Sequence, residues 1–415
     1  MEHVRIKSIA NSNLLNTINI SIILHYVRDH GASYRSEMSK ALNLSLPAVS
    51  RAVNQLIKKD YLVEKRIITA TGKQAHEVEI NASFGIFVGI SIELPAIKFS
   101  RMDMAGNILD IYEAAISSDT ANLEEFVLER LHLYLQKTYF HNDTPLKVLS
   151  VCLALPAAID QKKGKINAVL FQRLNGINLQ TSIEKDLQVP VLLENNENLA
   201  ALAEKYYQEG SEEDILAFIT IHQGIGAGLI VNGQLYRGAN GAAGEIGYQH
   251  LKIVPNHEAP DVELYEKIAS ISQIQRIAIN LIQAGKGEDI FRAANYTYSN
   301  IDHILLGKLA AAGSEDAIYV LKQYAEVLAF GLSNFLVTMN PETIILGGNV
   351  CDIENLETSI ITPLKTALQR LIPFPVPNIR PTRLGREAIV IGASQYALEN
   401  TILKYYPYIL FDGKE

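Results

Sequence analysis

A cluster of carboxylates and amides occupies residues 194–198, where the sequence reads Glu-Asn-Asn-Glu-Asn. The cluster follows a short apolar run and precedes an Ala/Leu-rich segment with helical spacing, so we expect a strand that leads into a helix. Such side chains can bind the hydroxyl groups of a ligand, and a carboxylate can also take a proton in a reaction. The same residue types cap helices, so a purely structural role is the alternative.

The chain that positions this cluster has 415 residues, a length that predicts two or three domains. Its composition, 48% hydrophobic and 20% charged, is typical of a folded soluble protein. The sequence has no apolar run of membrane-spanning length, and its N-terminus lacks the apolar core of a signal peptide. We therefore expect a cytoplasmic protein with no membrane association. Cys152 and Cys351 lie in or beside apolar stretches, which predicts buried, reduced thiols.

Charge is distributed unevenly along the chain. Residues 1–80 hold eleven Lys/Arg against seven Asp/Glu, a balance of +4, and because the whole chain carries −8, the remainder carries −12. This asymmetry predicts a small basic module joined to an acidic body. An acidic body excludes nonspecific coating of nucleic acid by the whole chain.

Residues 1–80 show the pattern of a winged helix-turn-helix. Apolar side chains at helical spacing predict a first helix at 14–29, which Gly31 ends. A second helix is predicted at 35–42, with Ser33 as its candidate cap.

A third helix is predicted to begin at Ser45, because a serine cap precedes a proline in the first turn, Pro47. Two extended segments, 61–68 and 76–80, follow around a glycine-containing turn. In this architecture the third helix enters the major groove and the hairpin tip reaches the DNA backbone or minor groove. The predicted DNA contacts are Ser45, Ala48, Ser50, Arg51, Asn54 and Lys73. The alternative is a three-helix bundle that contacts protein.

Beyond residue 80, buried strands alternate with amphipathic helices, and the same order of strands, hairpin and helices occurs twice. This recurrence predicts an α/β body with two lobes and a ligand cleft between them. We expect a DNA-binding domain at 1–80 and a first lobe at 81–200 that is completed by about 385–405. The second lobe is expected at 201–384.

Four motifs carry a family resemblance: NLSLPAVSRAVNQL (43–56), GIGAGLIVNGQLYRGANGAAGEIG (224–247), NPETIILGG (340–348) and AIVIGASQYAL (388–398). Through them the chain resembles the repressor, open reading frame and kinase (ROK) family, and within it the xylose and N-acetylglucosamine repressors. The resemblance implies an N-terminal winged helix-turn-helix followed by an actin-like, ribonuclease H-like two-lobed sugar-kinase fold. It also implies operator DNA and a sugar or sugar-phosphate effector as partners, and self-association as a homodimer or homotetramer.

Residues that serve catalysis in the sugar kinases of this family are replaced here. Asn196 stands where the kinases have an Asp that takes the proton from the sugar hydroxyl, and an amide cannot accept that proton at neutral pH. A general-base contribution of roughly 10²–10⁴ in rate is therefore absent. The DxGGT phosphate hairpin of the kinases aligns with a segment that contains Ser91, Glu93, Leu94 and Pro95. Glu93 would repel a triphosphate and Pro95 has no N–H, so we expect no enzyme activity.

The second phosphate loop retains Gly224, Gly226 and Gly228 but reads HQG where GTG is usual. A glycine-rich turn alone is weak evidence of a nucleotide site. Close packing of a helix explains these glycines at least as well.

Many members of the family bind zinc through one His and three Cys after the GEIG motif. Here Tyr248 stands at the His position and no cysteine lies between Cys152 and Cys351, so that zinc site cannot form. The remaining candidate ligands in this loop are His250, His257, Glu258 and Asp261. Solvated surface side chains are the simpler interpretation, and we expect no metal and no cofactor.

The resemblance assigns the sugar site to polar groups whose family counterparts hydrogen-bond sugar hydroxyls. The predicted ligand-binding residues are Asn195, Asn196, Glu245, Tyr248 and Glu266. The amides are expected from the first lobe and the carboxylates from the second, so that a bound sugar favours one lobe angle. The alternative is that Glu245 caps a helix or pairs with Arg237, and that Asn196 only starts a helix.

These features predict a sugar-responsive, DNA-binding transcriptional regulator that represses carbohydrate-use genes and is inactive as a kinase. Two alternatives stay open: an ATP-dependent sugar kinase, and a regulator that is controlled by a protein partner.

Overall fold

The computed structural model describes residues 12–68, 72, 74–93, 95–117, 120, 122–136, 140–141, 144–160, 165–167, 178–207, 213–254 and 261–403. The chain clusters into two compact units. The first unit takes in 1–153, 178–192 and 393–415, and the second takes in 154–177 and 193–392. Within the described ranges, no helix combines the length and apolar character needed to span a bilayer.

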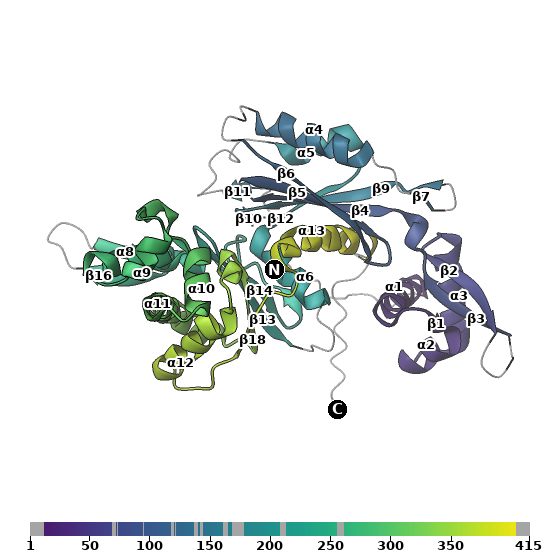
Figure 1. The fold of residues 1–415 in the computed structure, drawn as a ribbon. Coiled ribbons are helices and arrows are strands. Elements are labelled where there is room, and N and C mark those ends of the chain that lie inside the picture. Colours follow the sequence, from purple (N-terminus) through teal and green to yellow (C-terminus); the bar gives the residue numbers. More distant parts are fainter. Residues whose placement is uncertain are drawn as a thin grey trace. The chain divides into compact units, whose positions relative to one another are not determined.

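The N-terminal part of the first unit has three helices and a three-stranded sheet, coloured purple in Figure 1. The helices are α1 (Ser12–His30), α2 (Arg35–Ala41) and α3 (Leu46–Lys58), and the strands are β1 (Ser33–Tyr34), β2 (Leu62–Ile68) and β3 (Gln74–Ile80). The strand order is β1-β3-β2, and β2 and β3 form the antiparallel wing. The buried apolar side chains that hold these elements together include Ile23, Val27, Met38, Val49, Val53, Leu56 and Val78. This is the winged helix-turn-helix that the apolar spacing predicted.

Local chemistry explains where these helices begin. Ser45 caps α3, because its Oγ accepts a hydrogen bond from the N–H of Ala48 at 3.4 Å. The cap predicted for α2 was wrong. Ser33 lies in β1, where it pairs with Val78 of β3, and Tyr34 precedes the helix with its N–H donated to Glu37 Oε2 at 3.0 Å. Because Ser33 pairs with β3 of the wing, it is not the residue that precedes α2.

A five-stranded sheet forms the centre of the first unit, with the order β12-β9-β4-β5-β6. Its strands are β4 (Ile86–Glu93), β5 (Ala96–Asp103), β6 (Ile108–Ala115), β9 (Val148–Leu155) and β12 (Val191–Asn195). Helices α4 (Leu123–Gln136) and α5 (Leu179–Leu187) lie on one side of the sheet and α13 (Ala388–Leu398) on the other (Figure 1). Successive side chains of β5 point to opposite faces of the sheet. Phe99 contacts the ring of Tyr134 in α4, whereas Ser100 hydrogen-bonds Ser394 in α13.

The second unit contains another five-stranded sheet, with the order β15-β14-β13-β18-β19. Its strands are β13 (Ile215–Ile221), β14 (Ile225–Val231), β15 (Gln234–Leu235), β18 (Thr343–Gly348) and β19 (Asn378–Pro381). Strand β13 runs antiparallel to β14 and parallel to β18. Helix α6 (Asn196–Tyr207) packs on one face of this sheet. The predicted recurrence of an α/β pattern is confirmed.

The opposite face of the second sheet is covered by helices that together bury the core of this unit (Figure 1). They are α7 (Tyr265–Ala269), α8 (Ser272–Gln283), α9 (Glu288–Ala293), α10 (His303–Ala311), α11 (Glu315–Met339) and α12 (Thr362–Leu371). The remaining strands of the described residues are short: β7 (Phe140–His141), β8 (Thr144–Pro145), β10 (Ala158–Asp160), β11 (Lys165–Asn167), β16 (His250–Val254) and β17 (Asp261–Leu264).

The division of the chain differs from the sequence-based one in a way that affects the site. The predicted limit at residue 200 assigned Asn195 and Asn196 to the first lobe, whereas both belong to the second unit with Glu245 and Glu266. The reason is that α6, which begins at Asn196, packs on β13 and β14. These four residues therefore lie in the same compact unit of the structure. The limits at 80 and about 385 stay predictions.

Candidate functional site

The polar cluster at 194–198 begins helix α6, and Asn195 is its cap. The Oδ1 atom of Asn195 accepts the N–H of Asn198 at 3.0 Å, and its Nδ2 donates to the carbonyl oxygen of Ala157 at 3.2 Å. A capping side chain satisfies one of the backbone donors that every helix start leaves unpaired. Both polar groups of Asn195 are thus used within the protein, as the structural alternative expected, and its ligand role stays a prediction.

Asn196, the first residue of α6, is in a different situation. Its side chain is 4% exposed, and its Oδ1 is buried without a hydrogen-bond partner. The Oδ1 of Asn198 is likewise buried and unpartnered. An unsatisfied buried acceptor costs roughly 1–3 kcal/mol, so these two oxygens favour a ligand that brings hydrogen-bond donors. Asn198 was not among the predicted ligand residues, although it lies on the same helix turn.

Glu194 precedes the cap and is 1% exposed. One carboxylate oxygen accepts the N–H of Asn195 and the side-chain amide of Asn198, both at 2.9 Å. The other oxygen accepts Nε of Arg237 at 2.6 Å. Arg237 therefore pairs with Glu194, and the alternative in which it pairs with Glu245 is wrong.

Glu245, Tyr248 and Glu266 form one electrostatic cluster at the 3₁₀ turn η3 (Ile246–Tyr248). Burial and the negative charge of Glu266 raise the pKa of Glu245. Burial followed by the charges of Glu266 and Glu245 raises the pKa of the Tyr248 hydroxyl. Burial also raises the pKa of Glu266, which the positive charge of Lys267 partly offsets. The negative charge of Glu266 thus acts on both Glu245 and Tyr248, which places these two groups close to Glu266.

The predicted capping role of Glu245 is not seen. Glu245 stands at the N-cap position of η3, but its side chain makes no capping hydrogen bond. Glu266 lies over the same turn, because a methyl group at Gly247 would lie 3.1 Å from Glu266 Oε2. Tyr248 is exposed beside these two half-buried carboxylates.

Strand β14 links this cluster to the start of α6. The backbone of Glu197 in α6 packs directly on Gly228, and its side chain lies over Gly226. Between these glycines, Ala227 donates its N–H to the carbonyl oxygen of Gly244 at 2.8 Å, one residue before Glu245. The start of α6, which carries the predicted asparagines, and the turn that carries Glu245 therefore both contact residues 226–228 of β14.

The segment aligned with the second phosphate loop of the kinases begins with His222, whose ring makes contacts within the protein. His222 Nδ1 contacts the side-chain oxygen of Asn349, whose own N–H lies 3.3 Å from the same nitrogen. The carbonyl oxygen of His222 accepts the N–H of Ile271 at 2.9 Å. These contacts tie the HQG segment to its neighbours, and the glycines that follow are explained by the packing of α6.

The first phosphate hairpin also carries its own contacts. Glu93 Oε1 accepts the hydroxyl of Ser91 at 2.8 Å and lies 3.9 Å from Nζ of Lys98. The carboxylate at this turn therefore stands where a phosphate would need donors. Leu94 lies outside the described residues.

The candidate metal ligands are only partly described. His257 and Glu258 lie outside the described residues, as does the side chain of Asp261. Elsewhere in the described chain, no group of three or more His, Cys, Asp and Glu side chains could hold a metal ion. The expectation of a metal-free protein stays a prediction.

The predicted DNA-reading face is the solvent face of α3. Ser45, Arg51 and Asn54 are exposed, and Ala48 and Ser50 are half-buried. The opposite face of this helix is buried through Val49, Ala52, Val53 and Leu56. Lys73 at the wing tip lies outside the described residues.

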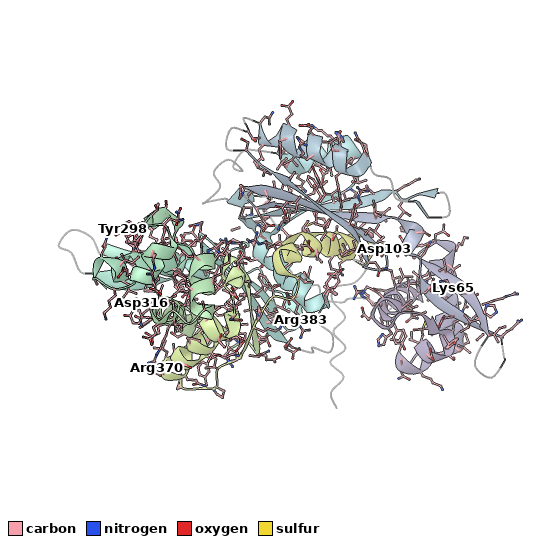
Figure 2. The ribbon with its side chains drawn as sticks, in the orientation of Figure 1. Lys65, Asp103, Tyr298, Asp316, Arg370 and Arg383 are labelled. Atoms are coloured by element: carbon pink, nitrogen blue, oxygen red, sulfur yellow. The ribbon has the colours of Figure 1, made fainter. Side chains whose placement is uncertain are left out.

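Two further residues bear on this face. On the wing, Lys65, labelled in Figure 2, pairs with Glu79 at 2.5 Å, so its charge is partly neutralised. The prediction missed Leu46, which is 50% exposed at the first position of α3. A leucine inside an otherwise regular apolar spacing gives no sequence signal of exposure.

Comparisons with known proteins agree with this architecture. The model of the ROK family matches residues 88–400. A xylose repressor of Caldicellulosiruptor bescii is 23% identical over 389 residues, which cover 92% of this chain and 96% of the relative. The crystal structure of a ROK family transcriptional regulator, a homolog of the E. coli MLC protein, has a TM-score of 0.73 at 20% identity and covers 94% of this chain and 98% of its own.

A ROK family glucokinase from Streptomyces griseus, solved with glucose and AMPPNP, has a TM-score of 0.61 at 21% identity. It covers 75% of this chain and 99% of its own. The regulator and the kinase therefore share the body fold, and the regulator also spans most of the rest of the chain. The predicted fold class, a winged helix-turn-helix followed by an actin-like two-lobed body, is confirmed.

Proposed function

The chain belongs to the ROK family, and on this premise we propose that it is a sugar-responsive repressor that binds operator DNA through α3. The observation that carries the proposal is the exposed polar face of α3, with Ser45, Arg51 and Asn54, joined to a ROK body. The length of the match supports it, because the xylose repressor covers 92% of the chain and the glucokinase only 75%.

The body acts in this proposal as a sensor and not as a kinase. The position of the catalytic base is held by the amide of Asn196, which cannot take a proton. At the two phosphate loops, a carboxylate at Glu93 and the ring of His222 stand where the kinases present backbone donors. Binding of a sugar is therefore separated from phosphoryl transfer.

The effector in this proposal is an unphosphorylated sugar. Sugar hydroxyls can donate to the unpartnered oxygens of Asn196 and Asn198 and to the carboxylates of Glu245 and Glu266. A phosphate dianion near these two carboxylates would meet like charge, which disfavours a sugar phosphate. The name of the relatives makes D-xylose the first sugar to test.

We further propose a cytoplasmic homodimer or homotetramer. One winged helix with few cations binds DNA only modestly, whereas a second module held at a fixed spacing makes its contact intramolecular. A two-fold symmetric operator is the expected partner of such a dimer.

The test selects duplexes from a random DNA pool with the purified protein and then titrates D-xylose, D-glucose and their phosphates into the selected complex. We expect a two-fold symmetric sequence, and one neutral sugar that changes its affinity by about 5- to 150-fold, as typical couplings of 1–3 kcal/mol do. Enrichment of no sequence, or ATP-dependent phosphorylation of any of these sugars, would overturn the proposal.

A further inference from the structure

The loop that leads from Arg237 to Glu245 crosses the second unit in close contact with its neighbours. A methyl group at Gly241 would lie 2.0 Å from the carbonyl oxygen of Ile159, and one at Gly244 would lie 1.8 Å from that of Ala227. Both glycines have positive φ, at +80° and +89°. Backbone contact fixes the middle and the end of this loop, and the side chain of Arg237 fixes its beginning.

The contact at the beginning of the loop is a buried ion pair of well-defined geometry. Glu194 uses both oxygens, one for the start of α6 and the other for Arg237 at 2.6 Å. An uncompensated charge at a 1% exposed position is costly, so the carboxylate requires its cation. The planar guanidinium is held by its Nε–H, which a lysine cannot reproduce.

The same carboxylate thus orders both halves of the candidate site. It holds Asn198, whose Oδ1 is unpartnered, and through Arg237 it holds the loop that ends at Glu245. We propose that Glu194 and Arg237 are positioning residues, which set effector affinity by fixing the loop of Glu245 relative to the start of α6. This rests on the proposed function, because it concerns the same sugar site.

Helix α6 offers a matched control at its other end. Glu204 is 2% exposed and accepts Nη1 of Arg380 at 2.9 Å and the N–H of Arg383 at 2.9 Å. Figure 2 labels Arg383 in this segment. The Glu204–Arg380 pair likewise joins an arginine to an almost fully buried glutamate, through Nη1 in place of Nε, but it anchors β19 and not the loop of Glu245.

The experiment compares Arg237→Lys with Arg380→Lys in the full-length protein. Hydrogen exchange of the 238–248 backbone is measured without ligand, D-xylose affinity by calorimetry, and stability by thermal melting. We expect Arg237→Lys to speed exchange across 238–248 and to weaken D-xylose binding about tenfold, as a coupling of roughly 1.4 kcal/mol would. Arg380→Lys should lower the melting temperature without either effect.

A double-mutant cycle separates positioning from general destabilisation. If Arg237 acts through Glu245, then Arg237→Lys should weaken D-xylose binding by less than about twofold in a Glu245→Gln background. If Arg237→Lys fails to fold, the paired change Glu194→Gln with Arg237→Gln removes both charges and leaves no buried ion unpaired.

The outcomes distinguish the two proposals. Unchanged exchange in 238–248, or losses of affinity that multiply in the double variant, would overturn the positioning role. If the wild-type protein bound neither D-xylose nor any other tested sugar, the proposed function would fail instead. The exchange measurement would still decide whether Arg237 orders the loop.

Discussion

Gly228 and Glu197 are in backbone contact: a methyl group on Gly228 would lie 1.9 Å from the carbonyl oxygen of Glu197. The backbones of strand β14 and helix α6 are therefore in direct contact at this point, with no room for a side chain on residue 228. In the kinases of the ROK family the corresponding glycines belong to a phosphate loop, but here their spacing is accounted for by the packing of α6. This contact also fixes the helix start that presents Asn196.

The first prediction concerns this contact. Gly228→Ala should destabilise the protein by about 3 kcal/mol or more, because backbone atoms of α6 would have to move. Gly226→Ala is the matched control on the same strand, since its added methyl would meet only the flexible side chain of Glu197 at 3.0 Å. Thermal melting of the two variants gives the comparison. Equal losses would mean that the close approach at Gly228 is relaxed in solution.

The second prediction concerns the charge of Glu245. Burial and Glu266 raise the pKa of Glu245 in the folded protein above its ordinary value of 4.5, so its proton favours the folded state at low pH. That contribution is lost as the pH rises through the folded-state pKa, and at pH 7.5 the folded state bears the full cost of the charge. Glu245→Gln should therefore raise the melting temperature at pH 7.5, and the difference should shrink towards pH 4.5.

The exposed Glu354→Gln is the control for this measurement, and its melting temperature should differ little from wild type at either pH. The groups facing Glu245 in the cluster are Glu266 and Tyr248, with Lys267 beside Glu266. A lower melting temperature of Glu245→Gln at pH 7.5 would show that the carboxylate has a stabilising partner in solution.

The third prediction is that neither the wild-type protein nor Asn196→Asp phosphorylates D-glucose or D-xylose. An aspartate would restore the base, but Glu93, Pro95 and His222 would still disfavour a triphosphate. At a 4% exposed position the new carboxylate should also lower stability. A coupled assay of ADP release measures the activity. Turnover in wild type well above background, and lost on changing Asn196, would contradict the prediction.

The sequence predicted the fold from signals that are local. Apolar spacing and the Ser45 cap gave the helices of the winged domain, and alternating strands and helices gave the two sheets. What it could not give is the partner of a charged residue far away in the chain. Arg237 was paired with Glu245 as an alternative, but Glu194 is its partner, because the contact depends on how β12 and the loop after β15 meet in space.

The site shows the same limit. The residue types at 194–198 suggested a ligand site or a helix cap, and the structure divides these roles between adjacent residues. Asn195 is the cap, whereas the side-chain oxygen of Asn196 is left without a partner. One residue of register around a helix start separates the two outcomes, and no pattern in the sequence specifies it.

The fourth prediction is that Arg51→Ala weakens binding to the selected operator by about 1–3 kcal/mol, since Arg51 is the exposed cation at the centre of α3. If Arg51 contacts a phosphate, the slope of log affinity against log salt should fall by about one, and if it reads a base, specificity at that base should relax. The control is Lys286→Ala, an exposed cation of the second unit, which should leave affinity unchanged. Unchanged affinity of Arg51→Ala at every salt concentration would place the DNA-reading surface elsewhere.

The last prediction separates the two functions of the chain. A ligand shifts the DNA-binding equilibrium only by its difference in affinity for the two states, and a bias of about 1–3 kcal/mol changes operator affinity by about 5- to 150-fold. Arg51→Ala should weaken operator binding and keep the D-xylose affinity of the wild type. Glu245→Ala should keep operator binding and lose the response to D-xylose, because a hydroxyl-binding carboxylate of the cluster is removed. Fluorescence anisotropy of the labelled operator measures operator binding and its response to D-xylose, and calorimetry measures the D-xylose affinity of each variant. If Glu245→Ala and wild type responded equally at every D-xylose concentration, the effector would bind outside the cluster of Glu245, Tyr248 and Glu266.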